Sequence, residues 1–219
     1  MMAWAVRVSD TASGVQLTDD QKENNATIFA QNMSGYGWLL EAICGALGNM
    51  ETESSLNPGA CEIDRGIPSG GILYGGGLGV IQWTDYPAYT ATKPHPLLWA
   101  SQHEGKTWYD GDFQSWLLTQ AENLEITSCG LSEGARWGWQ ESSSYPSISF
   151  NEYQKLQVTP EECAEYFFFC MEWHSFPDDG TLPLRKERAR KWYDFFGGVL
   201  PPPTPGLRTR SKDYWCFKI

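Results

Sequence analysis

Apolar residues recur at helical spacing between Trp38 and Met50, and this pattern constrains the fold more than any other part of the sequence. The repeating positions are Trp38, Leu39, Ala42, Ile43, Ala46, Leu47 and Met50. So broad a stripe predicts a helix that is buried on much of its surface. Its small residues Gly45, Ala46 and Gly48 predict that neighbouring helices approach it closely. The chain is therefore expected to fold around this helix.

Helix start signals surround this segment. Thr18 followed by Gln21 predicts a capping box, and the helix it begins ends at a turn over residues 34–37. Thr159, with Pro160 next and Glu162 third, predicts another start.

Two further helices are expected in the second half of the chain. Asp112 is the expected cap of one of them. The other spans about residues 184–196 and ends at Gly197 and Gly198.

The region between about residues 58 and 100 is rich in glycine and reads as loops, with one β-prone run at residues 80–83. The fold class is therefore mainly α (α+β), with a small β or loop region. Three parts are expected along the chain: an N-terminal arm (1–16), one domain (17–198), and a Pro-rich linker with a basic C-terminal tail (199–219).

Composition excludes several classes of partner. A net charge of −11 argues against nucleic acid and against anionic membranes, which both attract clustered Lys and Arg. The opening residues MMAWAVRVSD lack a basic segment followed by an apolar one, so synthesis without a signal peptide is expected. The 11 tryptophans suit either a core or a groove that stacks sugar rings.

The six cysteines and three histidines show no metal-ligand spacing, so no metal or other cofactor is expected. Buried free thiols are the favoured interpretation, although the sequence leaves disulfides open. The histidines have no evident partner and are expected on the surface or in loops.

Glu53 continues the apolar stripe to the C-terminal end of the predicted helix, whereas Glu51 falls off it. Apolar neighbours and the negative end of a helix dipole would favour a protonated carboxyl, as a general acid requires. By pattern alone, a solvated residue at the helix end is the alternative.

Two short motifs carry a resemblance to known enzymes. ESSLNP (residues 53–58) resembles the E-S-x-hydrophobic-N-P motif of lytic transglycosylases, and GVIQW (79–83) resembles their G-L-M-Q-I strand. The longer stretches AICGALGNM (42–50) and LGVIQWT (78–84) are similar to the phage tail lysozyme family. SFNEY (149–153), TPEECA (159–164) and RARKWY (188–193) agree, so the resemblance spans about residues 20–197.

The resemblance implies a two-lobed lysozyme-like fold with a central catalytic helix and a groove lined by the small β or loop region. Glu53 would be the catalytic acid, and Gln82 would contact the sugar or the attacking water. Asp85 is the candidate second carboxylate, although goose-type lysozymes place theirs one residue closer; a loop-capping aspartate is the alternative. Tyr74, Trp83 and Trp137 are candidates for stacking on sugars, or else core residues.

The implied activity is that of a peptidoglycan-degrading glycosidase acting on the β-1,4 bond between N-acetylmuramic acid and N-acetylglucosamine. Such domains are carried on the virion tail and open the host cell wall during phage entry, and residues 199–219 are a candidate contact with tail proteins. A lytic transglycosylase remains open, as does a non-catalytic protein that binds glycan or serves as a structural part of the tail.

Overall fold

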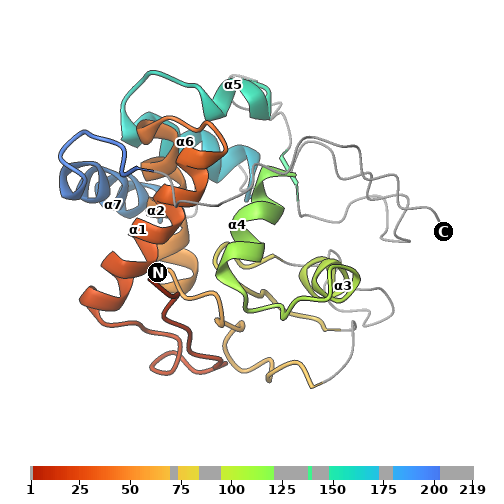
Figure 1. Cartoon of the computed structure of the whole chain (residues 1–219). Helices are drawn as coiled ribbons and strands as arrows, with labels where there is room; N and C mark the ends of the chain where they lie inside the picture. Colours follow the sequence, from red (N-terminus) through yellow and green to blue (C-terminus); the bar gives the residue numbers. More distant parts are fainter. Residues whose placement is uncertain are drawn as a thin grey trace.

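The structure is a computed structural model that describes residues 2–69, 74–83, 95–120, 138–139, 148–172 and 180–202. Over these residues the chain forms seven helices and no strand, which confirms a mainly α fold. They are α1 (Asp19–Gly35), α2 (Leu40–Ser54), α3 (Pro96–His103), α4 (Gly111–Thr119), α5 (Phe150–Gln154), α6 (Pro160–Cys170) and α7 (Leu182–Phe195). Figure 1 shows α7 on the opposite side of the molecule from α3 and α4.

Helix α2 is the centre of the packing. It contacts α6 and α7, which also pack against each other. A Cβ atom added to Gly45 would lie 2.6 Å from the backbone carbonyl carbon of Cys163 in α6. One added to Gly48 would lie 2.8 Å from the backbone nitrogen of Ala189 in α7. The predicted close approach at these glycines is therefore confirmed, and it depends on their having no side chain.

Helix α1 begins as the sequence predicts and packs on α4 and α2. Thr18 and Gln21 form the capping box. The predicted cap of α4 was wrong by two residues: Asp110 is the cap, and its side chain accepts a hydrogen bond from the backbone N–H of Phe113. Asp112 lies inside the first turn, where its carboxylate accepts hydrogen bonds from Trp4 and Asn32 and so ties α4 to α1 and the N-terminal segment.

Helix α5 fixes the start of α2 through aromatic packing. The Trp38 ring meets Phe150 and Tyr153 edge to face, with centroid distances of 5.5 and 5.7 Å. The Tyr153 hydroxyl donates to the backbone carbonyl of Ala42 at 2.8 Å. A capping box at Ser149 begins α5.

The β-prone run at residues 80–83 forms no strand, so of the expected small β or loop region the described residues show the loop form. These residues form a turn, and the described part of the chain has only isolated bridges, between Ser9 and Ala60, Cys61 and Leu78, and Leu78 and Trp83. The cause is backbone geometry: Gly79 and Gln82 have φ angles of +80° and +51°, which no strand accommodates. The run folds back on itself instead, with paired backbone hydrogen bonds between Leu78 and Trp83.

Two buried polar side chains hold this loop region together. Gln114 of α4 donates to the carbonyls of Pro58 and Trp108 and accepts the N–H of Val80. His95, expected on the surface or in a loop, lies in the loop just before α3 but is fully buried, and its Nε2 lies 2.7 Å from the carbonyl oxygen of Trp83. Carbonyl oxygens only accept hydrogen bonds, so Nε2 carries the proton, and Nδ1 accepts the N–H of Leu97.

The four described cysteines, Cys44, Cys61, Cys163 and Cys170, are buried free thiols as expected. No helix among the described residues is long and apolar enough to cross a membrane. Of the predicted linker and tail, residues 199–202 are described and the rest lies outside the described residues.

Gly48→Ala is expected to destabilise the protein by about 1–3 kcal/mol, because the new methyl group overlaps the α7 backbone and forces the helices apart. The free energy of unfolding from urea titration measures this. Glu187→Ala on the exposed face of α7 is the control and should change stability by less than about 0.5 kcal/mol. Equal stability of Gly48→Ala and wild type would show that the contact between α2 and α7 is loose.

His95 should make the protein less stable in mild acid. Burial lowers the pKa of His95 from 6.5 to about 4, and its hydrogen bonds to the carbonyls of Trp83 and Gly76 oppose this in part. Between these two values the unfolded chain binds a proton that the folded protein does not. The stabilisation is therefore complete above pH 6.5 and is lost as the pH falls towards 4, by about 3 kcal/mol.

His95→Gln isolates this effect, because wild type and variant share every carboxylate. The difference between their unfolding free energies should narrow by about 3 kcal/mol as the pH falls from 6.5 to 4. Parallel curves over this range would contradict the assignment.

Candidate functional site

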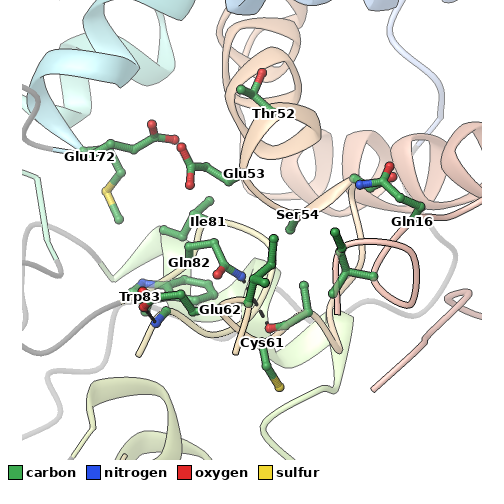
Figure 2. A pocket seen from close by; sticks show the side chains of 17 residues that line it. Gln16, Thr52, Glu53, Ser54, Cys61, Glu62, Ile81, Gln82, Trp83 and Glu172 are labelled. Atoms are coloured by element: carbon green, nitrogen blue, oxygen red, sulfur yellow. Dashed lines mark hydrogen bonds between the residues drawn. The ribbon is translucent and has the colours of Figure 1, made fainter. Parts of the chain in front are cut away.

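A cleft of about 640 Å³ opens where the C-terminal end of α2 meets the loop region. Four parts of the chain line it: the N-terminal segment, the end of α2, the loops between Ala60 and Trp83, and the residues after α6. Figure 2 shows these side chains; they include Gln16, Glu53, Glu62, Ile81, Gln82 and Glu172. The cleft is thus built from segments far apart in the sequence.

Glu53 lies one residue before the end of α2 and lines the cleft, as the apolar stripe predicts. Its side chain is 24% exposed, so its carboxyl group is open to the cleft. The helix ends at Ser54, because Ser55 and Leu56 both have φ angles of +59°. Two successive non-glycine residues in this region cost free energy, which the surrounding contacts must offset.

Those contacts come from Ser54 and Asn57. The Ser54 hydroxyl lies 2.8 Å from the carbonyl oxygen of Val80, so the helix end is joined to the Gln82 loop. Asn57 is fully buried, and its side-chain amide forms hydrogen bonds with the backbone of Arg7 and of Val15 in the N-terminal segment. The position of Glu53 is therefore fixed from two sides.

The expected apolar surroundings of Glu53 are wrong. Its carboxylate accepts a hydrogen bond from the guanidinium of Arg185, which is only 2% exposed. The same guanidinium donates to the Glu172 carboxylate at 2.6 Å. Glu53 is thus one member of a charged cluster beneath the cleft surface.

Glu51, by contrast, is buried on another face of α2. Its carboxylate accepts hydrogen bonds from Lys22, Lys191 and the Trp192 indole. The predicted separation of the two glutamates is confirmed, and Glu51 belongs to the packing of α2 on α1 and α7.

Gln82 lines the cleft from the loop region and faces the wall that carries Glu53 (Figure 2). Its side-chain nitrogen donates to the carbonyls of Gly79 at 2.9 Å and Ala60 at 3.4 Å. These bonds, and the positive φ of Gln82, fix its direction. Trp83 also lines the cleft but is only 2% exposed, so it forms the base of the wall and presents no open ring face.

Of the other predicted site residues, Tyr74 is placed by the structure away from the cleft lining. Its hydroxyl donates to the carbonyl of Gly66, and its ring packs against His95 at a centroid distance of 5.8 Å. Asp85 and Trp137 lie outside the described residues.

Sequence reasoning missed Arg185 and Glu62, and it offered Glu172 only as a residue on the late helix that could face the cleft. Arg185 could have been identified from the sequence. It stands four residues before Ala189 and seven before Trp192, so a charged residue occupies the buried face of α7. Glu172 lies just beyond α6 with no periodic signal of its own. The carboxylate of Glu62 accepts the N–H of Gly77 at 2.8 Å. Glu62 lies in a loop, where neither helical nor strand periodicity predicts which side chains face the cleft.

This arrangement suits proton transfer to a bound ligand. A carboxyl group opens on a groove, an amide side chain faces it, and further carboxylates stand within the same groove. In the parts of the chain that the structure describes, no three His, Cys, Asp or Glu side chains are grouped so that they could hold a metal ion.

Two comparisons with known proteins bear on this site. The chain is 28% identical over 177 residues to morphogenesis protein 1 of Bacillus phage B103, an alignment that covers 78% of this chain and 40% of that protein. The chain therefore spans less than half the length of this relative. A family model described as phage tail lysozyme matches residues 23–196, which include every described helix except the first turn of α1. The match covers most of the chain and includes both Glu53 and Gln82, so the chain belongs to the phage tail lysozyme family.

Proposed function

We propose that this protein is a peptidoglycan-degrading glycosidase that cleaves the β-1,4 bond between N-acetylmuramic acid and N-acetylglucosamine. The observation that carries the proposal is the position of Glu53, whose carboxyl group reaches a cleft from the rigid end of α2. Gln82 on the facing wall and membership of the phage tail lysozyme family support it. The substrate would be a glycan strand lying along the cleft.

In this proposal Glu53 protonates the glycosidic oxygen as the bond to the sugar breaks. Gln82 holds the sugar or the attacking water. Asp85 is proposed, on resemblance, as the carboxylate that activates this water, which in an inverting hydrolase stands roughly 6.5–9.5 Å from the acid. Attack by a hydroxyl group of the substrate itself would make the enzyme a lytic transglycosylase.

We also propose that the protein acts from the virion tail, at the cell wall of the host. The family description and the phage relative named a morphogenesis protein support this placement. Residues 199–219, Pro-rich and then basic, are the proposed contact with other tail proteins.

Glu53→Gln should lower the rate of cleavage of purified cell walls by about 100-fold or more, because an amide cannot give the glycosidic oxygen a proton. Release of reducing sugar, or loss of turbidity, measures the rate. Glu41→Gln, on the same helix but outside the cleft, is the control and should keep wild-type activity. Full activity of Glu53→Gln would remove Glu53 from the mechanism.

Mass spectrometry of the released fragments distinguishes the two reactions. Hydrolysis adds one water and leaves reducing ends, which is the expected result if a carboxylate such as Asp85 activates water. Products with 1,6-anhydro ends would identify a transglycosylase. Tight binding of glycan with no released fragment from wild-type protein would identify the non-catalytic alternative.

A further inference from the structure

The carboxylate of Glu53 shares its guanidinium partner with a second carboxylate. Arg185 donates through one terminal nitrogen to Glu53 and through the other to Glu172 and to the amide oxygen of Asn49. Figure 2 shows Glu53 and Glu172 reaching toward one another at the same end of the cleft. Two like charges come together here because a cation stands between them.

Arg185 has little freedom to leave this position. Its Nε donates to the Thr181 hydroxyl at 3.0 Å, and its guanidinium lies 4.9 Å from the ring centroid of Phe168. Its backbone carbonyl faces Gly48, where α7 comes closest to α2. The guanidinium is therefore a fixed charge beneath the cleft, whereas Glu53, at 24% exposed, is the member of the pair that can turn towards a ligand.

The other described charges near the end of α2 are engaged elsewhere. On α2 itself, Glu51 points to the opposite face, where α1 contributes Lys22 and α7 contributes Lys191. Arg188 of α7 donates to the hydroxyl of Thr52 at 2.9 Å. Across the cleft, Glu62 accepts hydrogen bonds from Arg65 and a backbone N–H.

We infer that Arg185 is a positioning residue that receives the Glu53 carboxylate when its proton leaves, with Glu172 as the second carboxylate held by the same guanidinium. This inference rests on the proposed role of Glu53 as the acid. Before reaction, the Glu53 carboxylic acid faces the glycosidic oxygen, and Arg185 keeps Glu172 and Asn49 as partners.

During the step, the proton passes from Glu53 to the glycosidic oxygen. The bond between that oxygen and the sugar carbon breaks, and its electron pair stays on the oxygen. The Glu53 carboxylate that remains pairs with Arg185. The guanidinium thus interacts more strongly with the group after transfer than before it, which is the condition for lowering the barrier.

Removing Glu172 and removing Arg185 should shift the pH dependence of activity in opposite directions. Glu172→Gln removes one of the two carboxylates that Arg185 pairs with, so Arg185 acts more strongly on Glu53 and the alkaline limb of kcat/KM should move to lower pH by about one unit. Arg185→Met removes the cation and should move that limb to higher pH by about one unit, with a lower kcat. Arg185→Lys keeps the charge and should restore the position of the limb.

The matched control lies on the same helix. Arg190 forms a bidentate pair with Glu161 of α6, at 2.7 and 2.8 Å, away from the cleft residues. Arg190→Met should keep the wild-type pH profile. Limbs that move in the same direction in Glu172→Gln and Arg185→Met, or that do not move at all, would overturn the inference.

A second measurement separates this inference from the proposed function. Titration of the Glu53 carboxyl carbon by NMR, assigned with Glu53→Gln, needs no turnover. Its midpoint should be lower in Glu172→Gln than in wild type and higher in Arg185→Met. This order without any cleavage by wild type would refute the proposed function alone, whereas cleavage without this order would refute the inference alone. If Arg185→Met does not fold, the direction of the Glu172→Gln shift decides.

Discussion

The distance between α2 and its two partner helices is the constraint on which the site depends. Gly45 and Gly48 let the backbones of α6 and α7 come closer than any side chain would allow. This approach brings Arg185 under the end of α2, within reach of Glu53 and Asn49. Core packing and the placement of the guanidinium at the cleft therefore depend on the same contact between α2 and α7.

Burying an arginine is costly unless its charge and its donors are all matched. Here two carboxylates, an amide oxygen and a hydroxyl supply the matches, from α2, the end of α6 and the start of α7. The cluster therefore crosslinks three elements as well as facing the cleft. Removing one carboxylate would leave a buried charge without its full set of partners, and for this reason stability and activity are expected to be coupled at Glu172.

The parts of the fold that follow local rules could be predicted from the sequence. The capping boxes at Thr18 and Thr159, the buried stripe of α2 and the inward direction of Glu53 all follow from short spacings in the chain. The turn at residues 80–83 could not be predicted in this way. Its β-prone residues bend because Gln82 has a positive φ angle and because Ser54, distant in the sequence, donates a hydrogen bond to the carbonyl of Val80. His95 and Arg185 were missed because their partners lie on other elements, and a polar residue buried by tertiary contacts looks in sequence like one facing solvent.

The N-terminal segment has a consequence for anyone cutting this protein into fragments. The family match begins at residue 23, yet Ala12, Val15 and Gln16 form part of the cleft wall. A fragment trimmed to the matched region would also strip the buried Asn57 amide of its backbone partners at Arg7 and Val15. Asn57 closes the turn that ends α2. Loss of its partners would therefore also disturb the position of Glu53. A minimal fragment for engineering should therefore begin before Arg7, outside the boundary that homology suggests.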